Sequence, residues 1–592
     1  MRKLWSLYQE VLGAVSPSAR GFLVWYAVAL GFLAVLDSAA LGLLALLIAP
    51  MATGSLPSLP VIGQLDFGGS LIAIAVLCVV IVLKSLASLA VLFWGSRRGA
   101  IYEIELGTRL FGAFLRSPWE MRLTRNTADI VRFTDSSVAV LVTMFLLPGA
   151  SLISEALSFI SILVVVAVAQ PVTALTTLIY LSIIGFVLYL WVAREARRAG
   201  EVNLHYAIQT SRFIYGMVAS MKEITLRGKL DEAGGVVEDS RRRSTRARAN
   251  LAFLSQVPRY ALEGGLIAGF AIMGLVGYWV GGATGAITSV ALFSVAGFRM
   301  APAVVRVQQV LSELTANSPH ARIVLDEIYA SEKAHDEFHS EKQLPLANEP
   351  KSLVLENVTF SYQTSPKPAL DGLSLTIDMG TTVAFVGSSG SGKSTAIDVI
   401  LGFLQPQSGT VQIDELPLAE VADAWRRRLG YVPQDVSIFD GTVAENVALS
   451  WTGEYDETRT RKALAQAKLL DTIESRPGGL NARVGERGLA LSGGQRQRLG
   501  IARALYPNPL VLVMDEATSA LDTKTEAEVN DAISDLRGET TIILVAHRLS
   551  TIMQADKIFY MREGKVVDQG TFQELVERVP DFAQQAQLSG LA

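Results

Sequence analysis

The stretch GSSGSGKST, at positions 387–395, has the composition and spacing of a loop that holds phosphate groups. It follows the β-branched run VAFV and precedes the helix-forming run AIDVIL. In that setting backbone N–H groups and the positive end of a helix dipole point at a phosphate. Lys393 would reach the β- and γ-phosphates of a nucleotide, and Ser394 would bind Mg²⁺. The predicted phosphate-binding residues are Gly387, Ser388, Ser389, Gly390, Ser391, Gly392, Lys393, Ser394 and Thr395.

Carboxylates follow a second apolar run, LVLVMDEATSALD, which is typical of a buried parallel strand. Asp515 at its end suits the Mg²⁺ shell, and Glu516 can orient or deprotonate an attacking water. A third apolar run, TTIILVAHRLS, leads into His547. A histidine taken alone is more often structural, but its place after an apolar strand favours a role near the γ-phosphate.

The elements that must position these residues occupy only part of the chain. The sequence has 592 residues, of which 50% are hydrophobic, and its mean hydropathy is positive. The excess of hydrophobic residues lies between about residues 20 and 317, so we divide the chain into a membrane half and a soluble half. The 52 basic residues nearly balance the 56 acidic ones, which gives no support to nucleic acid as a partner. The single cysteine, Cys78, excludes an intramolecular disulfide, and we expect a lipid-facing or packed thiol.

The membrane half contains six apolar segments long enough to span a bilayer as helices. They are residues 21–51, 69–94, 137–169, 172–193, 260–279 and 286–305. We expect the first to be retained, since it is too long for a signal peptide. Lys and Arg concentrate in the connections 95–136 and 194–259, which are therefore predicted to be cytoplasmic, together with both termini and the soluble half. The length of these connections predicts that the second to fifth membrane helices continue beyond the bilayer.

The soluble half resembles the nucleotide-binding domain of ATP-binding cassette (ABC) transporters from about residue 354 to 575. The resemblance implies ATP and Mg²⁺ as cofactors. It implies adenine stacking by Tyr362, Mg²⁺ binding by Ser394, Gln434 and Asp515, and catalysis by Glu516, His547 and Gln434. The other matching residues are the loop 387–395, the signature LSGGQ with Ser492, Gly493, Gly494 and Gln495, and Asp522 at the end of the segment 519–522.

The signature raises a question of its own, because one chain then has two loops for phosphate. In the ABC family the signature closes on the γ-phosphate bound by a second domain. The resemblance therefore implies a head-to-tail pair of chains with two ATP between them. We expect a homodimer, and a heterodimer stays open. Ser492 would also serve as a helix N-cap, which is compatible with that role.

The order of the halves is similar to that of an exporter-type half-transporter. We predict an all-α, six-helix transmembrane domain over 1–320, a linker over 321–350, and an α/β P-loop ATPase domain over 351–592. The predicted location is the bacterial inner membrane. Residues 116–131 and 212–228 resemble the short transverse helices that dock on nucleotide domains, and Glu486 matches the exporters' X-loop; ordinary solvated loops are the alternative. A non-transporting regulatory membrane ATPase is the alternative of another class, while the apolar spans argue against a soluble mechanical ATPase.

Charged residues in or beside the spans bear on the substrate, because such residues are costly within a membrane and by default indicate function. They are Asp37, Lys84, Glu155, Arg259, Glu263 and Arg299. Arg259 and Glu263, four apart on one helix face, could neutralise each other, and Asp37 and Lys84 could also pair. The stretch PRYALE with Lys84 and Arg299 is weakly similar to exporters that flip lipid-linked oligosaccharides. We expect Lys84, Arg259 and Arg299 to face a cavity for an amphipathic, anionic, lipid-linked substrate; multidrug, lipid and peptide export stay open.

Overall fold

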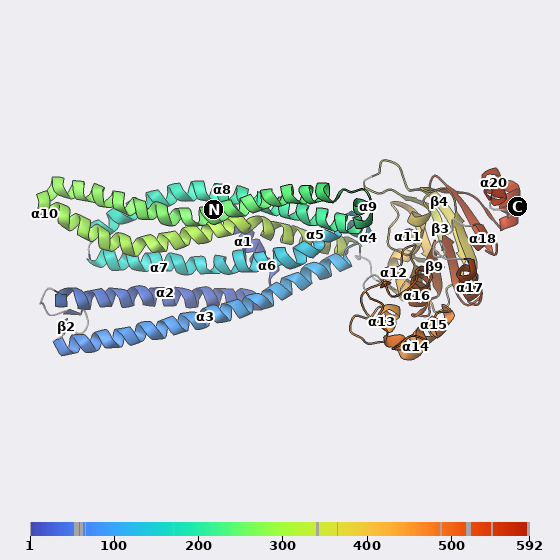
Figure 1. The fold of residues 1–592 in the computed structure, drawn as a ribbon, viewed down its shortest axis with the longest axis horizontal. Coiled ribbons are helices and arrows are strands. Elements are labelled where there is room, and N and C mark those ends of the chain that lie inside the picture. Colours follow the sequence, from blue (N-terminus) through green and yellow to red (C-terminus); the bar gives the residue numbers. More distant parts are fainter. Residues whose placement is uncertain are drawn as a thin grey trace. The chain divides into compact units, whose positions relative to one another are not determined.

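The structure is a computed structural model that describes residues 2–52, 58–59, 63–64, 67–169, 171–338, 343–363, 365–485, 488–516, 523–545 and 549–588. Two compact units make up the chain (Figure 1). The membrane unit comprises residues 1–117 and 124–335, and the nucleotide unit comprises 118–123 and 336–592. The predicted fold class, a helical membrane half followed by an α/β nucleotide half, is confirmed.

Long helices form most of the membrane unit. They are α1 (Arg2–Ala14), α2 (Pro17–Ala52), α3 (Phe67–Arg116), α7 (Leu147–Ala169), α8 (Pro171–Ala219) and α10 (Leu230–Phe338). Shorter elements connect them: β1 (Ser58–Leu59), β2 (Gly63–Gln64), α4 (Trp119–Thr124), α5 (Thr127–Arg132), η1 (Phe133–Ser137), α6 (Val138–Leu141), η2 (Val142–Leu146) and α9 (Met221–Leu226). The elements η1 and η2 are π-helical turns, which place the third predicted span on an irregular helix.

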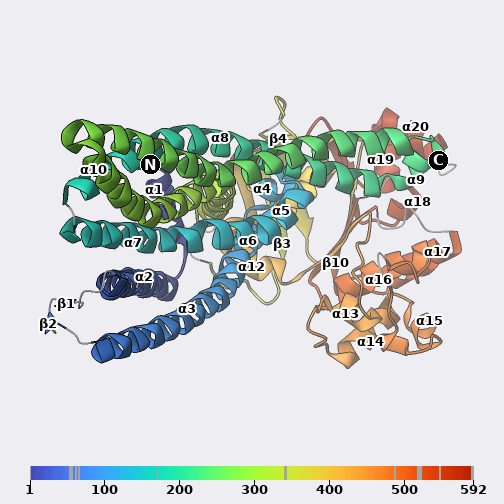
Figure 2. The ribbon, with the colours of Figure 1, turned by 60° about the vertical axis from the view of Figure 1, so that its left-hand side comes forward.

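The helix α10 consists of two arms that run back along each other (Figure 2). The arms meet at Gly281 and Gly282. Gly282 has φ of 63° and ψ of −153°, a conformation that is open to glycine only. The fifth and sixth predicted spans occupy one arm each. The second arm continues to Phe338, so residues 321–338 of the predicted linker are helical, with Val324, Leu325 and Ile328 buried on one face.

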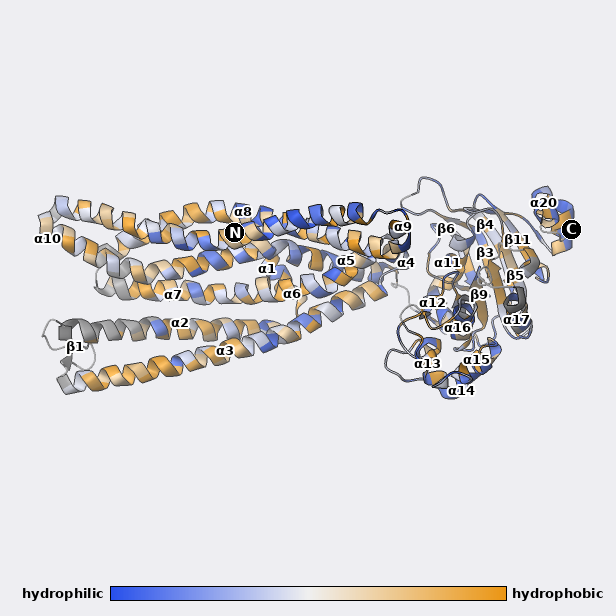
Figure 3. Cartoon of the chain, viewed as in Figure 1, coloured by the Kyte–Doolittle hydropathy of each residue, from blue (hydrophilic) through white to orange (hydrophobic). Residues whose placement is uncertain are grey.

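Hydrophobic residues predominate along much of the long helices of the membrane unit (Figure 3), and many of them are exposed. In the described part of the chain, five helices are long and apolar enough to cross a membrane. They correspond to the first five predicted spans, and the sixth, at 286–305, is helical within the second arm of α10. As predicted, α3, α8 and α10 extend far past the apolar runs, and polar residues become frequent where α8 approaches α9 (Figure 3). This is the architecture of a multi-pass membrane protein.

Two sheets organise the nucleotide unit. A six-stranded sheet has the order β12-β11-β5-β10-β9-β8, in which β11, β5, β10, β9 and β8 are parallel. Its strands are β5 (Thr382–Val386), β8 (Leu429–Val432), β9 (Val511–Asp515), β10 (Thr541–Val545), β11 (Lys557–Arg562) and β12 (Lys565–Gly570). An antiparallel sheet has the order β4-β3-β6-β7, from β3 (Ser352–Phe360), β4 (Leu370–Asp378), β6 (Ser408–Ile413) and β7 (Leu416–Pro417).

Helices cover the six-stranded sheet, and its central strands supply two hydrophobic cores because alternate side chains point to opposite faces. In β5, for example, Val383 and Phe385 join the core with α11 and the antiparallel sheet, whereas Ala384 and Val386 join the other. The helices are α11 (Lys393–Ile400), α12 (Leu418–Arg426), α13 (Val443–Ala448), α14 (Glu457–Gln466), α15 (Leu470–Glu474), η3 (Gly479–Asn481), α16 (Gly493–Leu505), α17 (Thr523–Ser534), α18 (Leu549–Ile552), α19 (Phe572–Arg578) and α20 (Pro580–Leu588).

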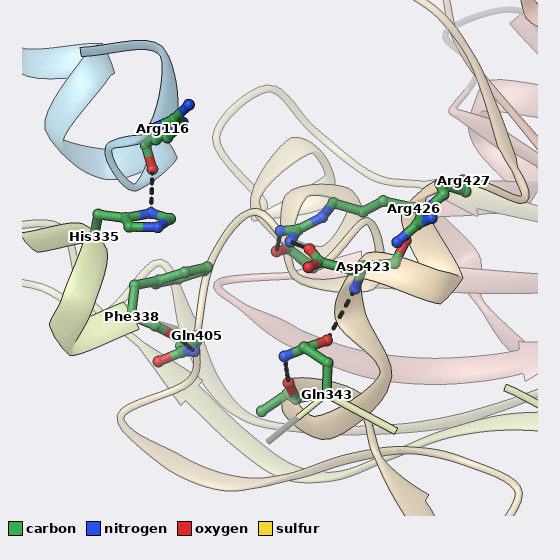
Figure 4. Close-up of polar contacts among 10 residues, drawn as sticks. Arg116, His335, Phe338, Gln343, Gln405, Asp423, Arg426 and Arg427 are labelled. Carbon is green, nitrogen blue, oxygen red and sulfur yellow. Dashed lines mark hydrogen bonds and ion pairs between the residues drawn. The ribbon is translucent and has the colours of Figure 1, made fainter. Parts of the chain in front are cut away.

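Within the nucleotide unit, side-chain amides connect the end of α10 and the segment after it with the rest of the unit (Figure 4). The amide nitrogen of Gln405 donates to the carbonyl of Phe338 at 3.4 Å. Gln343 donates to the carbonyl of Ala419 at 3.0 Å and accepts from the N–H of Asp423 at 3.2 Å. Within the membrane unit, the His335 ring lies 2.9 Å from the carbonyl of Arg116 (Figure 4).

Candidate nucleotide and substrate sites

The carboxyl ends of the parallel strands gather the predicted nucleotide residues. The phosphate loop follows β5, Gln434 follows β8, and Asp515 and Glu516 end or follow β9. Strand β10 lies between β5 and β9, so the residues after it belong to the same edge of the sheet. His547 follows β10 by two positions but lies outside the described residues, as does Asp522. Ligands bind at this edge of open parallel sheets.

The phosphate loop is folded tightly against its own sheet. A Cβ atom on Gly387 would lie 2.1 Å from the carbonyl oxygen of Met561, so only glycine fits there. The Lys393 ammonium donates to the carbonyls of Gly387 at 2.8 Å and Ser388 at 3.0 Å. Burial lowers the pKa of Lys393, against the opposing effect of the Glu516 and Asp515 charges. The loop therefore curls around its own cation at the start of α11, where phosphates bind best.

Tyr362 lies beside the end of this loop. Its hydroxyl is 3.3 Å from the hydroxyl of Thr395, and its ring meets Phe360 edge-on with centroids 5.0 Å apart. These contacts fix the orientation of a half-buried ring next to the phosphate loop. The position is compatible with stacking on the base of a nucleotide whose phosphates occupy the loop.

Glu516 and Gln434, predicted separately from distant motifs, are in direct contact. The amide nitrogen of Gln434 donates to a carboxylate oxygen of Glu516 at 2.7 Å. Glu516 has a left-handed backbone conformation with φ of 48°, and its N–H donates to the carbonyl of Val545 at 2.9 Å. The contact places a carboxylate beside the amide that the resemblance assigns to Mg²⁺.

Two neighbours of Asp515 were missed from the sequence. Tyr431 on β8 shares a hydrogen bond with Asp515, and burial raises the pKa of Tyr431 to about 12. Burial, followed by the Asp515 charge, raises the pKa of Asp398 to about 6. Asp398 stands four positions after Ser394 on α11, hence on the same helix face. That spacing is the sequence signal that could have identified it.

The signature residues begin a helix on another part of the domain. The Ser492 hydroxyl accepts from the N–H of Gln495 at 3.3 Å, and the Gln495 side chain accepts from the N–H of Ser492 at 3.0 Å. This capping box confirms the predicted N-cap and fixes Gly493 and Gly494 in the first turn of α16. Helix α16 packs against α13, α14 and β8. Because β8 is three strands from β5, the strand that leads to the phosphate loop is about 14 Å away.

The two segments predicted to dock on nucleotide domains differ in their surroundings. Trp119 of α4 belongs to the nucleotide unit, where it stacks on Phe403 at 5.3 Å and lies under Arg122. In the second segment, Leu226 of α9 is 87% exposed. Arg212 makes a two-pronged ion pair with the buried Asp129, at 2.8 and 2.5 Å, which joins α8 to α5. Glu486 lies outside the described residues.

A cavity of about 590 Å³ lies in the membrane unit between α2, α3, α7 and the second arm of α10. We call it the charged cavity, because Asp37, Lys84, Glu155, Arg306 and Glu313 line it. Lys84 binds Asp37 at 2.6 Å and so joins α3 to α2, a pairing foreseen from the sequence. Arg306 binds Glu155 at 2.6 Å and joins α10 to α7. Arg306 was missed, although it directly follows the sixth predicted span.

The other intramembrane cations have different surroundings. Arg259 binds Glu263 at 3.1 Å on the same face of α10, as the four-residue spacing allowed, and both side chains are more than half exposed. Neither residue lines the charged cavity. The side chain of Arg299 lies outside the described part of the structure. Of the three predicted substrate cations, the described structure therefore places Lys84 in this cavity.

Comparison with known proteins identifies the nucleotide unit and the fold. Residues 370–519 match the family model described as ABC transporter. ATP-dependent lipid A-core flippases are 43% identical over 229 residues in Ralstonia nicotianae (38% of this chain, 39% of the relative) and 41% identical over 243 residues in Idiomarina loihiensis (40% and 42%). The ABC transporter ATM1 of Toxoplasma gondii is 44% identical over 248 residues, 38% of this chain and 22% of the relative.

The chain thus spans less than half of the length of these relatives. A solved bacterial Atm1-family ABC exporter with ATP bound matches almost the whole chain, with a TM-score of 0.75, 23% identity, and coverage of 96% of this chain and 98% of the other. At that identity the match establishes the fold. The chain therefore has the fold of an ABC exporter half-transporter, and its nucleotide unit is an ATP-binding domain of the ABC transporter family.

Proposed function

We propose that the chain is one half of an ATP-driven exporter, which acts as a homodimer and exports or flips an amphipathic, anionic, lipid-linked substrate. The observation that carries the proposal is the pair of cations, Lys84 and Arg306, which line the charged cavity together with three carboxylates inside a membrane unit rich in exposed apolar residues. Ionisable groups at membrane depth are costly and mark the paths of substrates or ions. The relatives named as lipid A-core flippases support the lipid-linked class.

In the proposed cycle Lys393 exchanges the carbonyls of its own loop for the phosphates of ATP. The Ser394 hydroxyl, the Asp515 carboxylate and the amide oxygen of Gln434 would hold Mg²⁺. This donor set fits, because Mg²⁺ prefers hard oxygen ligands and Gln434 binds Glu516 through its nitrogen, which leaves its oxygen for the ion. When bound, Mg²⁺ neutralises charge on the β- and γ-phosphates. Glu516 would accept the proton of the attacking water, with His547 near the γ-phosphate.

The ATP site is proposed to need a second copy of the chain. The signature helix α16 packs beside the edge strand β8, whereas the phosphate loop follows the central strand β5. A signature from a partner would complete the site, with Ser492 and Gly494 at the γ-phosphate. The exposed tip of α9, with Leu226 at its end, supplies an apolar surface for the partner's nucleotide domain. A heterodimer would use the same surfaces.

The proposed substrate headgroup competes for cations that are already paired. Lys84 and Arg306 are each held by one carboxylate. A phosphate or pyrophosphate can accept hydrogen bonds from both and displace Asp37 and Glu155, while a lipid tail stays in the bilayer. Arg259 and Arg299 are proposed as further cations on the substrate path. An uncharged drug has no means of displacing either carboxylate.

The test uses the full chain in sealed proteoliposomes with a polyprenyl-pyrophosphate oligosaccharide as the probe. We expect ATP-dependent movement of the probe and stimulation of ATP hydrolysis. Lys84→Gln and Arg299→Gln should reduce the stimulation while keeping most basal hydrolysis, and Arg241→Gln, on the exposed extension of α10, should not. Equal stimulation by neutral hydrophobic drugs in all variants would replace the proposal with multidrug export. Hydrolysis without movement of any probe would indicate a regulatory ATPase.

A further inference from the structure

A second cavity lies in the membrane unit and shares no lining residue with the charged cavity. Its volume is about 860 Å³, and its walls come from α1, α8 and the second arm of α10. We call it the interfacial cavity. It is also separate from every residue assigned above to ATP or to substrate.

The interfacial cavity lies across the expected boundary between hydrocarbon and headgroups. The fourth predicted span ends at residue 193. Tyr189 and Leu190, inside that span, line one part of the cavity, and Arg194 and Arg197 line the part just beyond it. Leu4 and Leu7 of α1 extend the apolar wall. The charged part of the lining includes Arg194, where the basic connection 194–259 begins, and the distribution of Lys and Arg assigns that connection to the cytoplasm.

Positive charge predominates in the lining. Its cations are Arg2, Lys3, Arg194, Arg197 and Arg322, and its carboxylates are Glu201 and Asp326. Arg197 is paired with Glu201 at 2.9 Å, and Arg322 with Glu10 at 3.1 Å. Within the described part of the chain, Arg2, Lys3 and Arg194 form no ion pair, and Asp326 is left as their counter-charge. A net positive rim above an apolar wall matches an anionic headgroup with an acyl chain.

Helix α1 is held firmly while its basic end stays accessible. Leu7, Tyr8, Val11 and Ala14 are buried, and the Tyr8 hydroxyl donates to the carbonyl of Leu146 at 3.1 Å. Trp5 is 54% exposed, as is usual for an aromatic side chain in the headgroup region. The apolar face of α1 is buried against the membrane unit itself, and the exposed Trp5 is what assigns this helix to the headgroup region. Helix α1 therefore presents Arg2 and Lys3 at the depth of lipid headgroups.

We propose that the interfacial cavity binds one anionic phospholipid of the cytoplasmic leaflet. Its acyl chain lies along Leu4, Leu7 and Leu190, and its phosphate lies among Arg2, Lys3 and Arg194. Each basic residue near a membrane surface strengthens binding to anionic lipid about fivefold. The bound lipid links α1 to α8 and α10, independently of what the proposed exporter moves.

The test is native mass spectrometry of the detergent-purified full chain, titrated with phosphatidylglycerol or with phosphatidylcholine of the same acyl chains. We expect one tightly bound phosphatidylglycerol per chain and much weaker binding of phosphatidylcholine. Arg194→Gln should weaken phosphatidylglycerol about fivefold, and the triple change of Arg2, Lys3 and Arg194 to Gln roughly hundredfold. Arg194→Lys should bind like the wild type.

The matched control is Arg97→Gln. Arg97 follows the second predicted span on α3, stacks over Phe93 at 5.4 Å and lies outside the interfacial cavity. Arg97→Gln removes one surface charge outside the interfacial cavity, so the affinity for phosphatidylglycerol should stay within about twofold of wild type. Leu190→Trp should weaken binding by filling the apolar part without changing any charge. Equal losses in Arg97→Gln and Arg194→Gln, or unchanged affinity in both Arg194→Gln and Leu190→Trp, would overturn the proposal.

Discussion

Glu516 has a backbone conformation that most residues avoid, with φ of 48°. Such strain costs on the order of 1 kcal/mol and persists where the surroundings fix it. Here the hydrogen bond from the Glu516 N–H to the Val545 carbonyl fixes the backbone, and the hydrogen bond from the Gln434 amide fixes the carboxylate. The carboxylate is therefore positioned in advance, so its chemistry should be separable from nucleotide binding.

Glu516→Gln should leave ATP binding intact and lower turnover by about 10² to 10⁴-fold, because general base catalysis contributes that much. Glutamine keeps the size of the side chain but cannot accept the proton of water. Phosphate release and equilibrium ATP binding measure the two effects separately. Glu539→Gln, at an exposed position of the same domain, is the control. Hydrolysis within a few fold of wild type would contradict the assignment.

Tyr362→Ala should raise the ATP concentration for half-maximal hydrolysis, since stacking of a base on an aromatic ring contributes about 1–3 kcal/mol. Tyr362→Phe keeps the ring and removes only the hydroxyl near Thr395, so it should behave almost like the wild type. A titration of hydrolysis rate against ATP distinguishes the two. If alanine and phenylalanine have the same effect, the hydroxyl contact matters and stacking does not.

At the scale of elements, helices, strands and glycine-rich turns could be predicted from their local sequence patterns. Contacts between segments that are distant in the sequence could not. The glycine-rich loop lies between a strand and a helix as expected, because its spacing itself encodes the turn. The pairing of Glu155 with Arg306 joins residues 151 positions apart, which no local pattern specifies. The continuation of α10 into 321–338 was missed because the buried face of Val324, Leu325 and Ile328 is formed by tertiary packing.

The helix extensions beyond the predicted spans contain a buried histidine that makes their stability depend on pH. His320 of α10 lies 3.3 Å from the hydroxyl of Ser137, and burial, followed by the charge of Arg132, lowers its pKa to about 4 from an ordinary value of 6.5. The folded state therefore keeps His320 neutral where the unfolded chain binds a proton. This contribution to stability is complete above pH 6.5 and is lost as the pH falls towards 4.

Lowering the pH from 7.5 to 5 should therefore cost about 2 kcal/mol through His320 alone. His320→Gln cannot titrate, so its loss over the same interval should be smaller by that amount. Unfolding of the membrane helices in detergent at the two pH values measures the difference. An identical pH dependence in both proteins would mean that His320 is protonated in the folded state or remains neutral in both states.

At the scale of the whole molecule, the residue types of the ATP site could be read from the sequence, but not how the complete site is assembled. Asp398 and Tyr431 approach Asp515 only through the packing of α11 and β8 around β9. Helix α16 packs beside β8, away from the strand that leads to the phosphate loop, and that the two loops serve separate ATP sites stays a prediction. In the proposed dimer each ATP site takes residues from both chains, so two chains with different defects should complement each other, which a site within one chain would not allow.

Mixing Lys393→Ala chains with Ser492→Arg chains should restore one intact ATP site in each mixed dimer. That site takes its phosphate loop from the Ser492→Arg chain and its signature from the Lys393→Ala chain, whereas neither homodimer has an intact pair. ATP-dependent crosslinking of the nucleotide domains measures closure, and chains carrying both changes are the control. The mixture should crosslink where each homodimer and the control do not. If it crosslinks no better than the homodimers, the phosphate loop and signature of the dimer are not shared between chains.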